Sequence, residues 1–264
     1  MSIPFTKASA CGNDFLIVDA RYAPADIAAF SQRICDRHNG VGADGVEWLS
    51  ADSGSDAAIR LINADGTEAE ISGNGTRCVA AYLVNNGAAG KLAIRTGAGT
   101  KHCELISRSA NSFEFEADMG EPAVDSPFAL KLSSGQISGT PVSMGNPHFA
   151  IFVDAFPADW PAIGAEVQRQ ANFKEGVNVE FVRVTGSQDI EVRFFERGVG
   201  ETQSSGTGSC ASAVAAIAAG KVTSTVNVHA VGGTQTIRWE NARWEKKVFL
   251  RGPAQLICQG EYFG

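Results

Sequence analysis

The strongest constraint on the fold of this 264-residue chain is an internal repeat. The dipeptide Gly-Asn at 12–13 recurs at 145–146, and the motif Ser-Gly-x-Gly at 72–75 recurs at 205–208, both 133 residues further along. Three more pairs of positions lie at this offset without a gap: Arg60 and Arg193, Asn63 and Glu196, Glu68 and Glu201. A series of matches in a single register predicts two homologous halves.

Each half carries the same pattern of secondary structure. Runs rich in β-branched and aromatic residues, bounded by Gly, Asn and Asp, predict strands at 15–19, 58–62, 91–95, 113–117, 149–153, 179–184, 190–195, 226–228 and 247–250. After each Ser-Gly-x-Gly an alanine-rich stretch predicts a helix that is apolar on nearly all sides and therefore buried, at 77–84 and 210–219. More polar helices are expected at 25–35 and 161–171.

These elements predict an α+β fold of two homologous domains related by a pseudo-two-fold axis. Each domain is expected to be a mostly antiparallel β-sheet or barrel wrapped around a central buried helix. We expect the first domain at 1–118, joined by a C-terminal strand at 253–264, and the second at 119–252. Gly and two Pro residues cluster in the expected linker at 119–126.

The composition argues against several classes of function. A net charge of -7 disfavours a nucleic-acid partner, and no apolar run is long enough to predict a membrane span. The N-terminus lacks the pattern of a signal peptide. The six cysteines form no C-x-x-C pair and have no metal-site spacing with the four histidines, so we expect reduced thiols, no metal and a cytoplasmic location.

Glycines at the start of a helix allow a ligand to approach the free backbone N–H groups, where the helix dipole favours an anion. A single motif of this kind is more often a plain N-cap by serine. Two motifs related by a pseudo-two-fold axis would instead place one side chain on each face of a bound carboxylate. This arrangement suits removal of a proton from one face of a carbon and its return to the other.

Longer motifs make the chain resemble the diaminopimelate epimerases, which act without a cofactor. They run in order over most of the chain: Phe5-Thr6-Lys7, Gly12-Asn13-Asp14-Phe15, residues 36–45 (Asp-Arg-His-Asn-Gly-Val-Gly-Ala-Asp-Gly), residues 63–70 (Asn-Ala-Asp-Gly-Thr-Glu-Ala-Glu), Met144-Gly145-Asn146-Pro147-His148, Val177-Asn178-Val179, and residues 196–202 (Glu-Arg-Gly-Val-Gly-Glu-Thr). The resemblance implies the fold described above, no cofactor, and a small amino dicarboxylate as substrate. It also implies a role in bacterial lysine and cell-wall precursor synthesis, and a homodimer.

The resemblance also implies roles for individual residues. The residues implied to hold the distal end of diaminopimelate are Asn13, Asn63, Asn146, Asn178 and Arg197. The backbones of Gly73, Asn74, Gly206 and Thr207 are implied to bind the carboxylate at the reacting carbon. His148 and Glu196 are implied to orient the reacting amino group and to tune the acid and the base.

The chain departs from the family at the two acid–base positions, where Ser72 and Ser205 replace cysteines. A serine hydroxyl is far less acidic than a thiol, and a gap of about five pKa units corresponds to roughly 7 kcal/mol, or about five orders of magnitude in rate. Serine therefore needs an adjacent base, for which His148 and Glu196 are candidates. Cys78 and Cys210, further along the two helices, are expected to be small core residues.

Three functions fit this pattern. The first is amino-acid epimerisation with serines as the acid–base pair, which the intact set of distal-pocket residues favours. The second is a dehydratase or tautomerase of the same fold with another substrate. The third is a non-catalytic binder of amino dicarboxylates.

Overall fold

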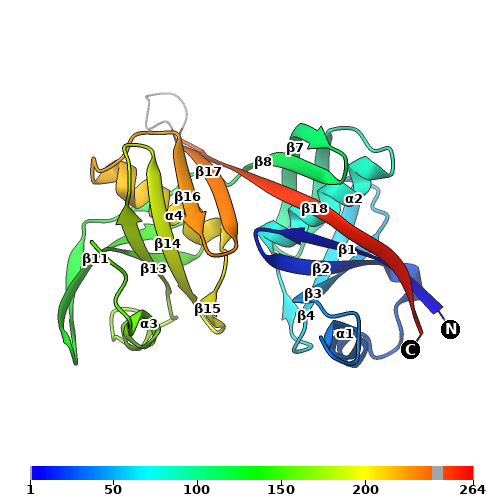
Figure 1. Ribbon diagram of the computed structural model, residues 1–264, viewed down its shortest axis with the longest axis horizontal. Helices are drawn as coiled ribbons and strands as arrows, with labels where there is room; N and C mark the ends of the chain where they lie inside the picture. Colours follow the sequence, from blue (N-terminus) through cyan, green and yellow to red (C-terminus); the bar gives the residue numbers. More distant parts are fainter. Residues whose placement is uncertain (1, 240–245, 264) are drawn as a thin grey trace. The chain divides into compact units, whose positions relative to one another are not determined.

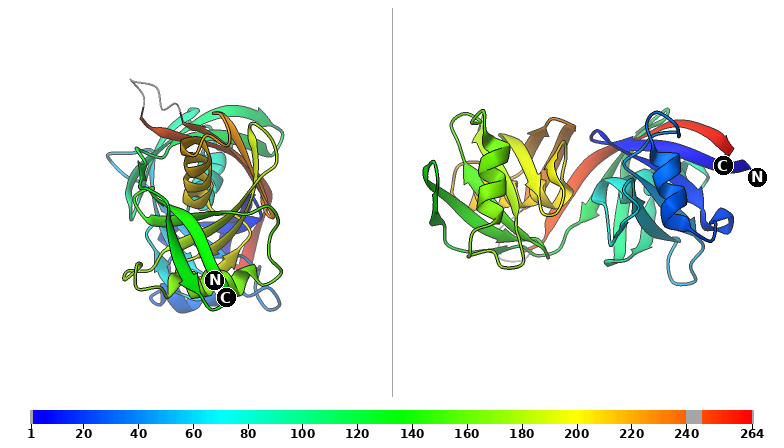
Figure 2. Two further views of the ribbon diagram at one scale, coloured as in Figure 1. Left: turned by 90° about the vertical axis from the view of Figure 1, so that its left-hand side faces the viewer. Right: turned by 90° about the horizontal axis from the view of Figure 1, so that it is seen from below.

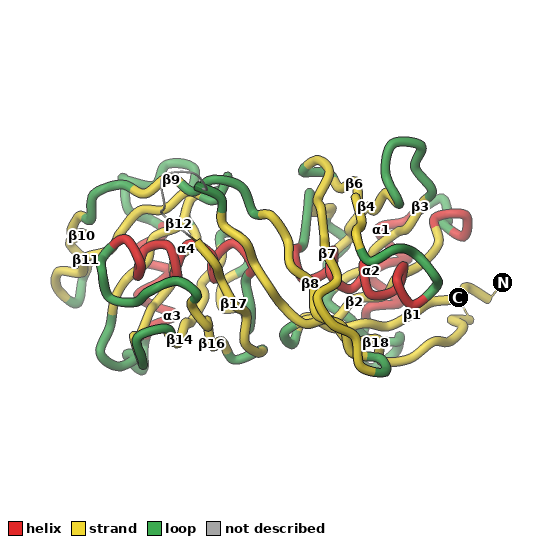
Figure 3. The backbone as a smooth tube through the Cα atoms, turned by 90° about the horizontal axis from the view of Figure 1, so that it is seen from above, coloured by secondary structure: helices red, strands yellow, loops and turns green. Residues whose placement is uncertain are grey.

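The computed structural model describes residues 2–239 and 246–263, which divide into two compact units (Figure 1). Unit 1 comprises residues 1–117 and 252–264, and unit 2 comprises residues 118–251. No helix in the described ranges has the length and apolar character that a bilayer span requires. Most of each unit consists of strands, with few helical segments (Figure 3).

Unit 1 is a closed barrel around one helix. Its strands are β1 (Ser2–Ala10), β2 (Asn13–Asp19), β3 (Gly45–Ser50), β4 (Ala57–Asn63), β6 (Lys91–Thr96), β7 (Gly99–Ser109), β8 (Ser112–Asp118) and β18 (Val248–Phe263), and β18 pairs with both β8 and β1 to close the ring. The pairs β2–β3 and β4–β6 are parallel and the other neighbours with a described register are antiparallel. The short strand β5 (Glu68–Ala69) pairs with β4, and a 3-10 turn occupies Ala20–Tyr22.

Unit 2 repeats this order. Its strands are β9 (Ala123–Val124), β10 (Phe128–Leu132), β11 (Gly135–Ser143), β12 (Pro147–Phe152), β13 (Asn178–Val184), β14 (Asp189–Glu196), β15 (Gly200–Thr202), β16 (Val226–Ala230) and β17 (Gly233–Trp239), followed by the first residues of β18. As in unit 1, the two parallel pairs are β12–β13 and β14–β16. The helix α4 (Gly206–Ala218) is enclosed by strands of its own unit (Figure 2, left).

The strand register confirms the repeat seen in the sequence. In unit 1, Phe15 of β2 pairs with Gly45 of β3, and Ile17 pairs with Glu47. In unit 2, the partners are His148 with Asn178 and Ala150 with Glu180, each 133 residues after its counterpart. Residues at equivalent positions therefore have equivalent places in the two barrels.

Side chains of the central strands alternate between two helices. In unit 1, Phe15 and Ile17 pack with α2 (Gly73–Asn85) inside the barrel, whereas Leu16 and Val18 pack with α1 (Ile27–Cys35) on the outside. Because successive side chains of a strand point to opposite faces, strands covered by a helix on each face read as continuous apolar runs. In unit 2 the outer helix is α3 (Trp160–Gln168).

The expected fold class, two α+β halves each built around a buried helix, is confirmed. The central helices begin earlier than expected, however, at Gly73 and Gly206 rather than at 77 and 210. The glycines therefore form the first helical turn instead of preceding it, because Ser72 and Ser205 satisfy that turn as N-caps. The sequence patterns also missed β1, β3, β7, β10, β11 and β17, which carry mixed polar and apolar residues, and the short strands β5, β9 and β15.

Candidate active site

The candidate residues divide between the two units, and the unit 2 set begins at the N-terminus of α4. The backbone N–H of Gly208 donates to Oγ of Ser205 at 3.2 Å, which makes Ser205 the N-cap. The Ser205 hydroxyl in turn donates to Oε2 of Glu196, at the end of β14, at 3.1 Å. Thr202 donates to the other carboxylate oxygen, Oε1, at 2.6 Å and holds Glu196 in this orientation. Ser205 therefore has the adjacent carboxylate that serine acid–base chemistry requires.

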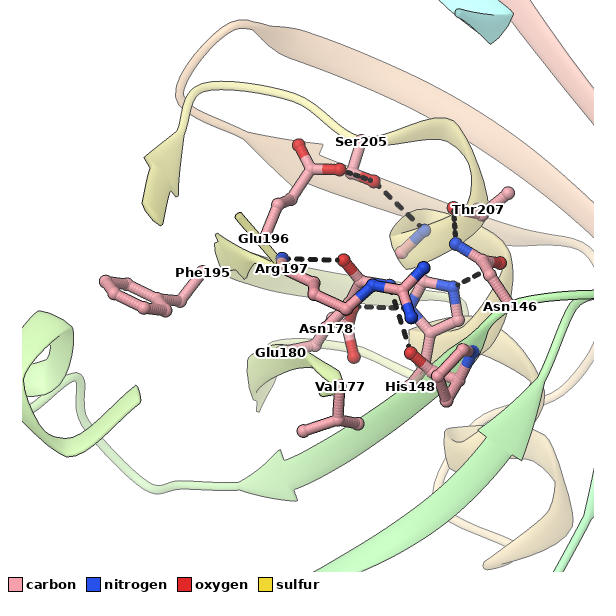
Figure 4. Close-up of polar contacts among 12 residues, drawn as sticks. Asn146, His148, Val177, Asn178, Glu180, Phe195, Glu196, Arg197, Ser205 and Thr207 are labelled. Atoms are coloured by element: carbon pink, nitrogen blue, oxygen red, sulfur yellow. Dashed lines mark hydrogen bonds and ion pairs between the residues drawn. The ribbon is translucent and has the colours of Figure 1, made fainter. Parts of the chain in front are cut away.

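His148, on β12, is fully enclosed and lies between two oxygens. Its Nδ1 is 2.6 Å from Oε1 of Glu180 on β13, and its Nε2 is 3.0 Å from Oδ1 of Asn146. The amide of Asn146 donates to Oγ1 of Thr207, in the first turn of α4, at 3.4 Å. Burial raises the pKa of Glu180, and the facing imidazole opposes this shift. His148 thus positions Asn146 and is in turn held by Glu180 (Figure 4).

Asn178 and Arg197 complete the unit 2 set. The side chain of Asn178 donates to the carbonyl of Pro147 at 3.0 Å and accepts from the backbone N–H of Arg197, also at 3.0 Å. The guanidinium of Arg197 is exposed and donates to the backbone carbonyl of Glu175 at 2.9 Å. Asn178 therefore ties β12 to the turn after β14, and Arg197 keeps donors that face solvent.

In unit 1 the corresponding helix, α2, begins at the first Ser-Gly-x-Gly motif, residues 72–75. The backbone N–H of Gly75 donates to Oγ of Ser72 at 3.1 Å. Within the described residues no acceptor receives the Ser72 hydroxyl, in contrast to Ser205. A Cβ built on Gly73 would meet no atom within 4 Å, so the backbone of the first helical residue is open to a ligand.

Asn13 and Asn74 are brought together in unit 1. The Asn74 amide donates to Oδ1 of Asn13 at 3.4 Å, and Asn13 donates to Oδ2 of Asp44 at 2.5 Å. The buried guanidinium of Arg77 donates to Oδ1 of Asn74, also at 2.5 Å. Asp44 and Arg77 are thus positioning residues that sequence reasoning did not identify, although Asp44 lies within a family motif.

The charges behind Asn13 form a compact network. Asp14 accepts from Arg37 at 2.7 Å and pairs with Lys7 at 2.9 Å. Burial alone would raise the pKa of Asp14, but the hydrogen bonds from these two cations hold it below its ordinary value. Arg37 also contacts Asp44 at 2.8 Å. A carboxylate pair held by two cations keeps the Asn13 loop in place.

Asn63 is not joined to the other unit 1 candidates by a described hydrogen bond. Its amide donates to Oγ1 of Thr67 at 3.1 Å within the β4–β5 turn. The equivalent position in unit 2 is Glu196, which contacts Ser205. The repeat is therefore asymmetric at this position: Ser205 donates to the carboxylate of Glu196, whereas Ser72 has no hydrogen bond to Asn63 among the described residues.

The two helix cysteines are core residues, as expected. Cys78 and Cys210 are fully buried in the clusters that surround α2 and α4. Burial raises the pKa of the Cys78 thiol far above its ordinary range, which disfavours a thiolate there.

Comparison with known proteins agrees with the motifs. The sequence profile described as diaminopimelate epimerase matches residues 5–124 and 140–257. A diaminopimelate epimerase from Pelotomaculum thermopropionicum is 38% identical over 279 residues, covering 98% of both chains.

The chain belongs to the diaminopimelate epimerase family.

A second family member, from Acidiphilium cryptum, is 37% identical over 271 residues that cover 98% of this chain and 95% of that protein. Solved structures with the same fold are more distant in sequence. A phenazine biosynthesis protein of the PhzF family from Bacillus anthracis has a TM-score of 0.74 at 16% identity and covers 100% of both chains. A probable proline racemase from Agrobacterium radiobacter, solved with bound carbonate, has a TM-score of 0.72 at 14% identity, covering 98% of this chain and 92% of that one.

Proposed function

We propose that this protein interconverts LL- and meso-diaminopimelate by removing the proton on one α carbon and returning a proton to the opposite face. The family membership supports the reaction class and the substrate. The observation that carries the chemistry is the hydrogen bond from Ser205 to Glu196, at 3.1 Å. An amino-acid Cα–H is so weakly acidic that serine needs this partner to act on it.

In this mechanism Ser205 and Ser72 supply the two acid–base groups, one from each unit. When Ser205 takes the substrate proton, its own hydroxyl proton passes to Glu196, and the reverse transfer makes Ser205 an acid. The N-terminal turns of α2 and α4 contribute free backbone N–H groups and positive dipole ends, which stabilise the carboxylate of the carbanion as charge develops.

The remaining candidates are proposed to hold the substrate. Amide groups of Asn13, Asn146 and Asn178, with Arg197, suit a distal end that carries one carboxylate and one ammonium group. Asn63 is also proposed to hold the substrate, because it begins the family motif at residues 63–70. A cytoplasmic location, a small amino dicarboxylate as the ligand and a homodimer remain predictions from the sequence.

The test is proton exchange in D₂O. Purified protein is incubated with LL-diaminopimelate, and NMR follows loss of the Cα–H signal and formation of the meso isomer. We expect exchange with inversion for the wild type and loss of at least about 10²-fold in Ser205→Ala. Absence of exchange, together with calorimetric binding of the same ligand, would refute turnover and favour the amino-dicarboxylate binder. Absence of both would favour another substrate.

A further inference from the structure

Glu47 is a fully buried carboxyl group that the mechanism above does not use. It lies on β3, where its neighbours Val46 and Trp48 pack outward with α1, so its own side chain points inward to α2. A Cβ atom built on Gly75 would collide with Oε1 of Glu47. The same Cβ position lies 3.0 Å from Cδ of Glu47 and 3.3 Å from Cβ of Ser72. The carboxyl group is therefore packed under the first turn of α2, beside Ser72.

Both carboxyl oxygens of Glu47 are buried without a hydrogen-bond partner among the described residues. Such a group destabilises a fold, so its presence needs an explanation. Burial raises the pKa of Glu47 to about 8, which keeps a proton on the carboxyl group at neutral pH.

The repeat supplies a direct comparison. Glu180 holds the equivalent position in unit 2, where a Cβ on Gly208 would lie 3.0 Å from its Oε1. There the carboxyl group has a partner, because Oε1 is 2.6 Å from Nδ1 of His148. In unit 1 the position equivalent to His148 is Phe15, which has no hydrogen-bonding group. Glu47 therefore occupies the position equivalent to Glu180 but has no imidazole to accept its hydrogen bond.

The Ser72 hydroxyl also lacks a partner: among the described residues it has no hydrogen-bond acceptor. Ser205 donates to Glu196, whereas the residue at the equivalent place in unit 1, Asn63, is bonded to Thr67. A buried acid without a partner thus lies next to a serine that lacks the acceptor found in the other unit. Both groups lie against Gly75 in the first turn of α2.

We propose that Glu47 is a positioning residue that exchanges a proton with Ser72. This inference rests on the proposed function. When the Ser72 O–H bond breaks and its proton goes to the α carbanion, the Glu47 carboxylic acid gives its proton to Oγ and becomes a carboxylate. In the other direction, Oγ takes the proton from the α carbon while the carboxylate takes the hydroxyl proton. Each direction transfers two protons and leaves Ser72 as a hydroxyl.

The experiment uses Glu47→Gln, which keeps the shape of the side chain and removes its exchangeable acid. Inversion of diaminopimelate in D₂O should fall about 10²- to 10³-fold. For the stereoisomer whose proton Ser205 removes, exchange without inversion should remain close to the wild-type rate. A purely structural role would lower exchange and inversion together, and that result would overturn the proposal.

Ser72→Cys provides the matched background. A thiol at position 72 does not need the carboxyl group, so adding Glu47→Gln to Ser72→Cys should change inversion less than about twofold. Equal losses in the serine and cysteine backgrounds would overturn the proposal. The proposal would also be overturned if Glu47→Gln inverted the substrate at the wild-type rate. It would likewise be overturned if the wild type were inactive while Ser72→Cys was active. If Ser72→Cys with Ser205→Cys binds the substrate and is also inert, the proposed function fails, and this inference fails with it.

Discussion

The buried acid on β3 makes the stability of the protein depend on pH in a way that one substitution should remove. In the native protein Glu47 keeps its proton up to a pKa of about 8, whereas its ordinary value in an unfolded chain is 4.5. Between these two values the native state binds more protons than the unfolded state. The contribution of Glu47 to stability is thus fully present below pH 4.5 and is lost as the pH rises toward 8.

The size of the effect follows from the two pKa values. Stability is lost at up to about 1.36 kcal/mol per pH unit in this window, and the slope is smaller near each pKa, so the loss between pH 5 and pH 8 is about 3.5 kcal/mol. Glu47→Gln has no titrating proton at this position. The difference in unfolding free energy between the variant and the wild type should therefore grow by about 3.5 kcal/mol over this range, in favour of the variant.

Denaturation by urea at several pH values measures this difference. Far-UV circular dichroism and tryptophan fluorescence should report coincident transitions, which checks that one unfolding free energy is defined. Glu47→Leu also lacks the acid and should give the same change with pH. A difference that stays constant within about 0.5 kcal/mol from pH 5 to pH 8 would refute the burial of a protonated carboxyl group at this site.

Three further predictions concern the two helix N-termini. Ser72→Cys with Ser205→Cys should raise epimerisation by orders of magnitude, because thiols are far stronger acids than hydroxyls; no gain with binding intact in the D₂O assay would contradict the assignment of these positions. In steady-state kinetics, Glu196→Gln should lower kcat about 10²- to 10³-fold when residue 205 is serine, and much less in the Ser205→Cys variant. Equal losses in the two backgrounds would exclude Glu196 as the partner of the serine. Gly75→Ala should destabilise the protein by about 1 to 3 kcal/mol, because its Cβ collides with Glu47, and thermal unfolding in a Glu47→Ala background should show most of this cost removed.

The repeat itself could be recognised without any structure, because it depends on residue identities at a constant offset. The same applies to the buried central helices, since an apolar stretch after Ser-Gly-x-Gly is a local pattern. The predicted helix starts lie four residues too late, because glycine disfavours a helix interior, whereas the N-caps Ser72 and Ser205 stabilise first turns that contain glycine. Strands with mixed residues, such as β7 and β11, were missed because pairing with neighbours stabilises them more than their own propensity does.

The sequence predicts which residues form the candidate sites, but not how they contact one another. Residues of the motifs could be named from the sequence, including Ser205 and Glu196. That these two share a hydrogen bond, while Ser72 and Asn63 do not, depends on side-chain orientations that no local pattern encodes. The structure reveals the link and leaves the roles of the residues as predictions.

Glu47 and Glu180 show the difference between what the sequence determines and what the tertiary structure determines. Both are buried glutamates on equivalent strands, and the 133-residue offset relates them in the sequence alone. Their environments differ because the neighbouring strand presents Phe15 to one and His148 to the other. A carboxyl group takes its pKa and its hydrogen bonds from whatever surrounds it in space. The chain therefore encodes two similar barrels locally, and packing between strands far apart in sequence makes their acid groups different.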